Sequence, residues 1–170
     1  MKKLVIMLVI LTTLITQAQE KHIFTVGFDP KLALDGAYDY DDTPILDFYF
    51  SAVVQVKRNE IGIVGEYANI NPYYWSFGFM YNRLLIKTNR IDVLLGGEVI
   101  IIQRGFKPQV QNEFIAYGLN ATTRFYIVDC LSVNLKLNAK YRTDLVKHYK
   151  TKDPIKISGF VSLSYIIKRW

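Results

Sequence analysis

The sequence predicts an all-β protein: a closed, antiparallel, up-and-down eight-stranded transmembrane β-barrel preceded by a cleaved signal peptide. Three observations predict this fold. Apolar and polar residues alternate strictly in stretches such as LSVNLKLNAKY, as in a strand whose two faces meet different environments. Eight segments have strand character, and no segment after the N-terminal apolar run shows helical periodicity. Long and short connections nearly alternate along the chain, as in membrane barrels.

The chain begins with a segment typical of a secretory signal peptide. Lys2 and Lys3 precede an apolar run over 4–15, and the small residues Thr16 and Ala18 precede a cut after Ala18. The run is too short for a spanning helix, and the polar residues after it argue against a retained anchor. We therefore expect residues 1–18 to be a signal peptide and residues 19–170 to form one outer-membrane barrel domain.

The predicted strands are longer than is usual in globular proteins, where about five or six residues are typical. Several exceed the roughly nine to eleven residues that a tilted strand needs to cross a bilayer. In chain order they cover residues 22–29, 45–57, 60–70, 73–86, 90–103, 113–127, 131–142 and 157–170.

Sorting each strand by parity separates an apolar face from a polar or small one. LDFYF in the second strand and WSFGF in the fourth place Phe and Trp opposite Asp, Ser and Gly. The fifth strand is the least regular, since both of its faces turn apolar after Val99, while the sixth and seventh alternate cleanly. In the last strand, Trp170 shares parity with Lys168 rather than with the apolar residues. A slip of one residue would exchange the two faces, so the pattern specifies register.

The connections support an up-and-down order. Tight turns are expected around 58–59, 88–89 and 128–130, and long connections over 30–44, 104–112 and 143–156, whereas 71–72 is a short connection on the long-loop side. Membrane barrels place short turns on one rim and long loops on the other.

If the apolar faces point outward, the barrel interior receives four acids and four bases that can pair. Buried charges are costly unless they are paired and hydrogen-bonded, so this balance is self-consistent. We expect outward Tyr73, Trp75 and Tyr81, together with the terminal Trp170, to form an aromatic belt. The predicted lumen charge network consists of Asp47, Glu66, Asp92, Glu98, Arg124, Lys136, Lys140 and Arg142.

The whole of residues 19–170 resembles the small eight-stranded barrels of the OmpA and OmpX type from the outer membrane of Gram-negative bacteria. The last strand, GFVSLSYIIKRW, resembles the signal that the outer-membrane assembly machinery reads in this family, although its terminal aromatic lies on the less apolar face. The resemblance implies a bilayer and lipopolysaccharide as surroundings, and a monomer.

Two charged loops are expected beside each other, because the first and last strands of a closed barrel are neighbours. Their bases either attract the acids of the other loop or contact lipopolysaccharide phosphates. The acidic loop carries Asp35, Asp39, Asp41 and Asp42, and the basic loop carries Lys147, Lys150, Lys152 and Lys156.

The residues give little indication of chemistry. The formal net charge of +6 is modest, and an exported chain rarely meets nucleic acid. Cys130 is the only cysteine, so no internal disulfide can form. His22 and His148 are expected at opposite rims, and no nucleophile accompanies His148. We expect no metal, no cofactor and no catalysis.

The leading hypothesis is a structural or surface-interaction protein that acts through its outer loops. A narrow transporter for small or apolar solutes is an alternative, suggested by an apolar upper lumen of Leu94, Ile100, Ile102 and Phe114. A lipid-modifying enzyme and a soluble lipocalin-like carrier are further alternatives. In such a carrier the apolar strand faces would point into the barrel and line an apolar cavity, but the sequence lacks the Gly-x-Trp motif of lipocalins.

Overall fold

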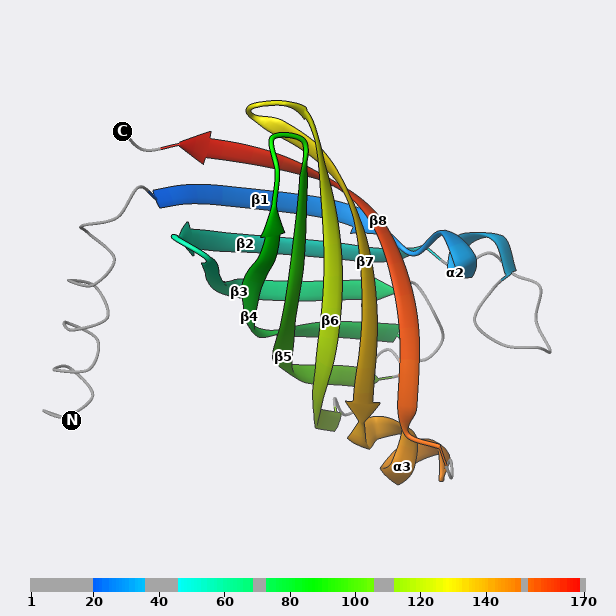
Figure 1. Ribbon diagram of the computed structural model, residues 1–170. Helices are drawn as coiled ribbons and strands as arrows, with labels where there is room; N and C mark the ends of the chain where they lie inside the picture. Colours follow the sequence, from blue (N-terminus) through cyan, green and yellow to red (C-terminus); the bar gives the residue numbers. More distant parts are fainter. Residues whose placement is uncertain (1–19, 36–45, 69–72, 106–111, 151–152, 169–170) are drawn as a thin grey trace, which may run out of the picture.

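The computed structural model describes residues 20–35, 46–68, 73–105, 112–150 and 153–168. The predicted closed antiparallel barrel is confirmed: each strand pairs with the next, and β8 closes the sheet on β1 (Figure 1). Its strands are β1 Glu20–Phe28, β2 Asp47–Val56, β3 Asn59–Ala68, β4 Tyr73–Lys87, β5 Ile91–Gly105, β6 Asn112–Val128, β7 Leu131–Arg142 and β8 Ile155–Lys168. The predicted signal peptide, residues 1–18, lies outside the described residues.

Two of the connections between strands contain short helices that the sequence patterns did not predict. They are α2 Pro30–Asp35 and α3 Thr143–Tyr149, both too brief to show a helical period. The Oδ1 of Asp29 accepts hydrogen bonds from the amides of Lys31 and Leu32, so Asp29 caps α2. Neither helix in the described part of the chain is long and apolar enough to span a membrane.

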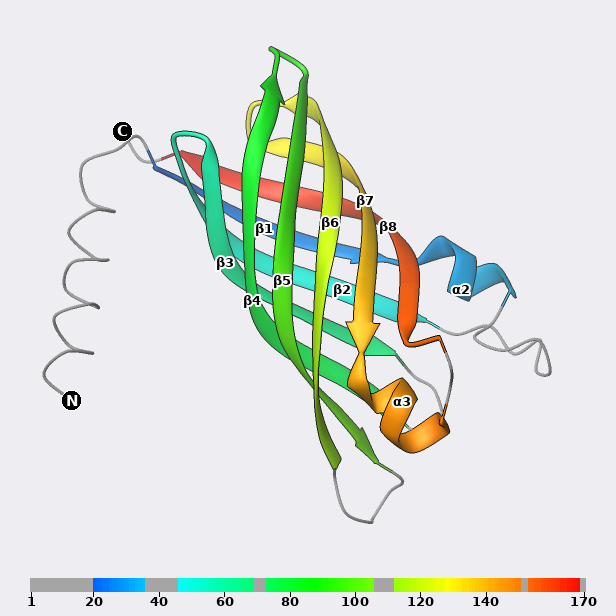
Figure 2. The same cartoon turned by 60° about the horizontal axis from the view of Figure 1, so that its bottom comes forward.

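The barrel has two unlike ends. The terminal rim carries the start of β1, the end of β8 and the short turns at 57–58, 88–90 and 129–130, whereas the helix rim carries α2 and α3 (Figure 2). The β4–β5 and β6–β7 hairpins project past their neighbours at the terminal rim. A register shift lies near the tip of each hairpin, at Leu84/Ile86 and at Tyr126/Val128. Such bulges bend and twist strands locally.

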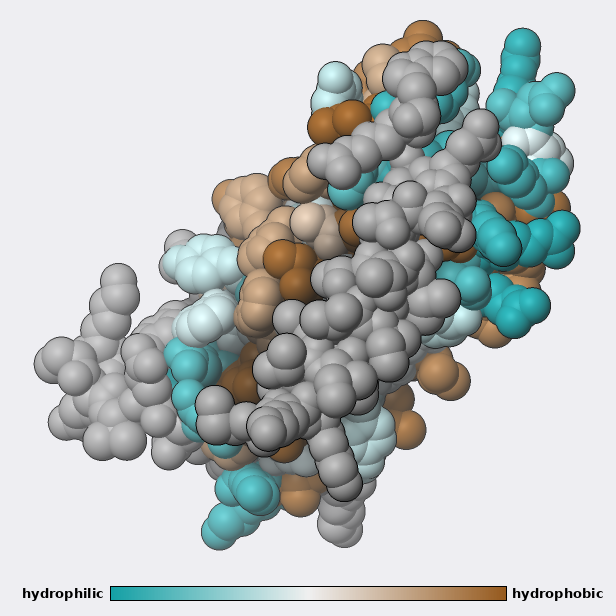
Figure 3. All heavy atoms as spheres, turned by 90° about the vertical axis from the view of Figure 1, so that its left-hand side faces the viewer, coloured by the Kyte–Doolittle hydropathy of each residue, from teal (hydrophilic) through white to brown (hydrophobic). Residues whose placement is uncertain are grey.

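Burial alternates along the strands as parity predicts. In β2, for example, Asp47 and Tyr49 are buried while Phe48 and Phe50 are exposed. The exposed side chains form an apolar outer wall, seen as brown areas beside hydrophilic teal clusters in Figure 3.

The interior is mixed rather than purely polar. An apolar cluster fills part of it, including Ile23, Val64, Met80, Ile100 and Phe160. The apolar residues expected together in the upper lumen are divided: Leu94 pairs with Leu84 close to the terminal rim, whereas Ile102 pairs with Phe114 close to the helix rim. Strand parity finds inward residues but does not find their height in the barrel, which depends on the stagger of the strands.

Candidate functional site: the barrel interior and its rims

A chain of charged side chains crosses the interior and joins three strands, β3, β5 and β7. Lys136 Nζ lies 2.9 Å from Glu98 Oε2, and Lys140 Nζ lies 2.9 Å from Glu98 Oε1. Lys140 also pairs with Glu66, which accepts a hydrogen bond of 2.9 Å from the hydroxyl of Tyr74. All of these side chains are buried, so each charge is compensated within the barrel. We call Glu66, Glu98, Lys136 and Lys140 the central network.

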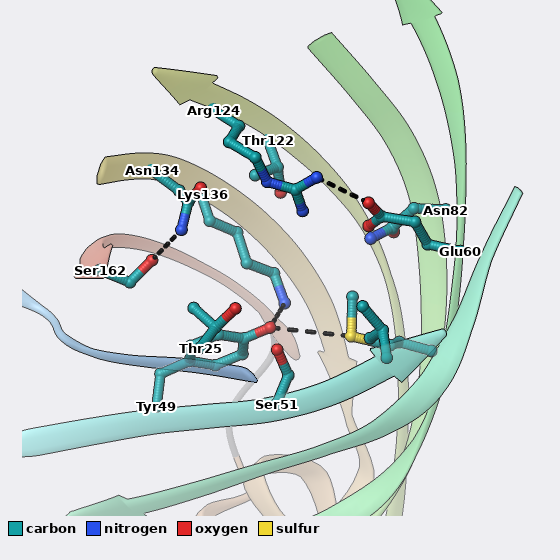
Figure 4. A pocket seen from close by; sticks show the side chains of 12 residues that line it. Thr25, Tyr49, Ser51, Glu60, Asn82, Thr122, Arg124, Asn134, Lys136 and Ser162 are labelled. Atoms are coloured by element: carbon teal, nitrogen blue, oxygen red, sulfur yellow. Dashed lines mark hydrogen bonds and ion pairs between the residues drawn. The ribbon is translucent and has the colours of Figure 1, made fainter. Parts of the chain in front are cut away.

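A second ion pair lies nearer the terminal rim. Arg124 Nη1 donates to Glu60 Oε1 at 2.8 Å across a cavity of about 20 Å³ (Figure 4). The ammonium of Lys136 reaches the same cavity, where it donates to the hydroxyl of Tyr49 at 3.1 Å and lies 4.2 Å from that ring. The cavity has room for about one water molecule, so side chains fill this level of the barrel.

A third cluster lies at the helix rim, where α3 follows β7. Asp144 Oδ2 lies 2.6 Å from Arg142 Nη2 and 2.7 Å from Arg104 Nε. Both guanidinium groups lie over the ring of Tyr74, at 4.6 and 5.3 Å from its centre. Burial raises the pKa of Asp144, but the hydrogen bonds and charges of the two arginines outweigh burial and hold this pKa below its ordinary value. This cluster fastens α3 to the barrel.

The eight residues expected in the lumen network are all buried, but they do not form a single network. Arg124 pairs with Glu60, and Arg142 pairs with Asp144. Asp92 accepts a hydrogen bond from the Tyr126 hydroxyl at 2.6 Å. The expected list omitted four buried charges: Asp29, Glu60, Arg104 and Asp144.

These omissions have different causes. Asp29 and Glu60 lie within predicted strands and share parity with inward Thr25 and Glu66, so applying the alternation to the whole of each strand would have found them. Arg104 lies at the end of β5, beyond the predicted end of the fifth strand. Asp144 lies on a helix, where strand parity says nothing about side-chain direction.

The charged loops are described only in part. Asp39, Asp41, Asp42 and Lys152 lie outside the described residues, as does the side chain of Asp35. Lys147 is exposed on α3, and Lys150 adopts a left-handed conformation that ends α3. Lys156 was expected in the loop and instead lies in β8, half-buried at an inward position, because that strand begins at Ile155.

The outer aromatic side chains form a row that sequence parity found only in part. Trp75 and Tyr81 are exposed on the outer wall, whereas the side chain of Tyr73 and all of Trp170 lie outside the described residues. Tyr81 lies in mid-strand and donates to Asn59 Oδ1 at 2.8 Å. Cross-strand register adds neighbours for Trp75 near the helix rim: a continuous exposed row of Phe28, Phe48, Tyr67 and Trp75.

The two histidines lie in different elements, His22 in β1 and His148 in α3, and only the backbone of His148 is described. No group of three or more His, Cys, Asp or Glu residues within the described ranges is arranged to hold a metal ion. Cys130 is exposed in the β6–β7 turn.

Solved structures with the same architecture include barrels from bacterial outer membranes. The chain has the fold of the small outer-membrane β-barrels. The N-terminal barrel domain of Pseudomonas aeruginosa OprF matches with a TM-score of 0.59 and 6% identity over 88% of this chain and 98% of that one. Neisserial surface protein A matches with a TM-score of 0.54 and 8% identity, over 88% of this chain and 95% of that one. Yersinia pestis outer membrane protein Ail matches with a TM-score of 0.52 and 12% identity, over 88% of this chain and 99% of that one.

These identities show a shared fold alone. No protein-family model matches the sequence, and no curated protein matches it.

Proposed function

We propose that this protein is an integral outer-membrane barrel with a closed lumen that acts at the cell surface through its helix rim. The observation that carries the proposal is the outer wall. Phe79, Leu119 and Ile157 are 69%, 71% and 74% exposed, in the midst of many other exposed apolar side chains. Soluble monomers rarely expose apolar patches of more than a few hundred Å², whereas lipid tails favour such a wall.

Barrel closure supports the same proposal. A β structure within lipid must pair every backbone amide and carbonyl, and a closed barrel leaves no free edge. The aromatic row of Phe28, Phe48, Tyr67 and Trp75 suits the interface between lipid tails and headgroups. In this proposal the assembly machinery inserts the chain as a monomer, with the short turns facing the periplasm and α2 and α3 facing outward.

The interior favours a surface role over transport. The central network crosses the barrel, and the cavity beside Arg124 holds about one water molecule. The two arginines held by Asp144 lie between this network and the outside. Exposed Lys147 and Lys150 at the helix rim suit contact with lipopolysaccharide phosphates. One of the similar structures is named as a surface protein, and another was determined in a phospholipid bilayer nanodisc.

The proposal is tested by refolding and fractionation. Protein refolded into octyl glucoside should migrate faster in unheated than in boiled gel samples, and should float with lipid vesicles in a density gradient. In cells, the protein should be recovered with outer membranes after a carbonate wash. Recovery in the soluble periplasm, with no flotation, would reject membrane insertion.

A further inference from the structure

A second cavity lies at the terminal rim. It has a volume of about 180 Å³ and is lined by residues of β1, the β4–β5 hairpin, β6, the β6–β7 turn and β8. We call it the terminal-rim pocket. The ends of β1 and β8 pair beside it through Lys21 and Lys168, and the two projecting hairpins rise past these ends (Figure 2). The pocket shares no residue with the cavity beside Arg124.

Three lysines from three different strands line this pocket. Lys168 Nζ pairs with Asp129 at 2.8 Å, and Lys21 Nζ lies 5.9 Å from the centre of the Tyr126 ring. Among the residues that the structure describes, no direct ion pair joins Lys21 or Lys87 to a carboxylate, although the charges of Asp92 and Asp129 act on Lys21 from within the pocket. Two ammonium groups are therefore available to an anion that enters the pocket.

The pocket also contains a carboxylate oxygen without a donor. Asp92 is buried, and its Oδ2 accepts the hydrogen bond from Tyr126, but its Oδ1 has no hydrogen-bond partner in the described part of the chain. An unsatisfied buried acceptor is costly, and a ligand that brings an N–H donor would remove that cost. The pocket thus offers positive charge and an acceptor side by side.

We infer that the terminal-rim pocket binds a phosphate group that carries a primary ammonium group, as in phosphoethanolamine. The phosphate oxygens would accept from Lys21 and Lys87, since a lysine ammonium is a common phosphate partner. The primary ammonium would donate to Asp92 Oδ1, which a quaternary ammonium without N–H bonds cannot do. The ligand comes either as a free phosphate monoester or as the headgroup of phosphatidylethanolamine, and only the lipid source rests on the proposed membrane insertion.

The first test is titration of the refolded protein in octyl glucoside, a detergent without phosphate. Calorimetry would compare O-phosphoethanolamine, phosphocholine, inorganic phosphate and ethanolamine on samples whose folding the gel-shift assay has verified. We expect O-phosphoethanolamine to bind at least about tenfold more tightly than the other three compounds. Only this compound brings both a phosphate for the lysines and an N–H donor for Asp92. Equal binding of phosphocholine, or no binding of O-phosphoethanolamine to folded protein, would overturn the inference.

Variants test separately the lysines that would bind the phosphate and the Asp92 carboxylate that would bind the ammonium group. The pair Lys21→Ala and Lys87→Ala should weaken O-phosphoethanolamine binding by at least about tenfold. Asp92→Ala, which removes the acceptor, should remove the preference for O-phosphoethanolamine over phosphocholine. The control pair Lys31→Ala and Arg83→Ala removes two exposed cations outside the pocket and should bind like the unchanged chain. Equal losses in the pocket pair and the control pair would mean general charge attraction and would reject the site.

An experiment with lipid vesicles distinguishes a free phosphate monoester from the phosphatidylethanolamine headgroup as the ligand. Protein floated from vesicles containing both phosphatidylethanolamine and phosphatidylcholine would be examined by native mass spectrometry. Retention of phosphatidylethanolamine by the unchanged chain, with loss in the Lys21→Ala and Lys87→Ala pair, identifies the lipid headgroup. Binding of the soluble probe without lipid retention identifies a free phosphate monoester.

Discussion

Glu98 shows how single residues hold this barrel together. It receives contacts from Lys136 at 2.9 Å, Asn138 at 2.7 Å and Lys140 at 2.9 Å, and it lies in a fully enclosed position. Removing one member of a buried ion network leaves the others without compensation, which costs more than the network contributes as a whole.

We therefore expect Glu98→Leu to lower the free energy of unfolding by about 3–5 kcal/mol, because Lys136 and Lys140 lose a shared partner. Guanidinium unfolding in lipid vesicles, followed by tryptophan fluorescence, measures this loss. The matched change Glu113→Leu removes an exposed glutamate of β6 and should cost less than about 1 kcal/mol. Similar costs for the two variants would contradict the importance of the central network.

Asp144 makes stability depend on pH. Its pKa is lower in the folded protein than in the unfolded chain, so it stabilises the fold above about pH 4, the ordinary aspartate range, and loses this effect as pH falls through the folded pKa. We expect Asp144→Asn to be less stable than the unchanged chain at pH 7, with the gap closing in stronger acid. The measurement is the guanidinium midpoint of both proteins between pH 7 and pH 3. A gap that does not change with pH would contradict this role of the carboxylate.

At the scale of elements, the strands depend on close approach to their neighbours. A Cβ built on Gly78 in β4 would lie 2.0 Å from the carbonyl oxygen of Val99 in β5, so the backbones would have to separate. A Cβ on Gly159 in β8 would meet nothing nearer than 3.7 Å, at Leu137. We expect Gly78→Ala to destabilise the barrel by about 1–3 kcal/mol and Gly159→Ala to be tolerated. Refolding yield by gel shift compares the two, and equal yields would contradict the packing argument.

The outer wall has a depth profile that lysine substitutions can measure. Leu119 lies in the middle of β6, whereas Ile155 begins β8 at the helix rim, and both are exposed. In a bilayer we expect Leu119→Lys to cost about 2–4 kcal/mol and Ile155→Lys about 0–1 kcal/mol, because the cost falls toward the interface. Unfolding in vesicles gives both values, and the absence of any difference would argue that the wall does not face lipid tails.

At the scale of the whole molecule, the filled interior predicts that the barrel does not conduct. Tyr49 and Phe160 pack with ring centres 5.2 Å apart, next to the central network. We expect no stable channel openings from the unchanged chain in planar bilayers, and a higher ion flux from the pair Tyr49→Ala and Phe160→Ala. Sustained conductance by the unchanged chain would contradict the closed lumen and favour the transporter alternative.

The sequence by itself determined the barrel, its strand order and the direction of most strand side chains. Alternation in a stretch such as LSVNLKLNAKY specifies register because one step exchanges the two faces, and eight long strands in lipid can only close. For the same reason, parity placed Glu66, Glu98, Lys136 and Lys140 inside before their contacts were known.

Only the tertiary structure decided which inward residues meet. Strand stagger sets the height of each side chain, so it paired Arg124 with Glu60 and separated Leu94 from Ile102. The helices α2 and α3 are held by Asp29 and Asp144, whose contacts depend on single side chains rather than on a repeating pattern. Periodicity reports which environment a residue faces, whereas partners depend on distances between strands far apart in the chain.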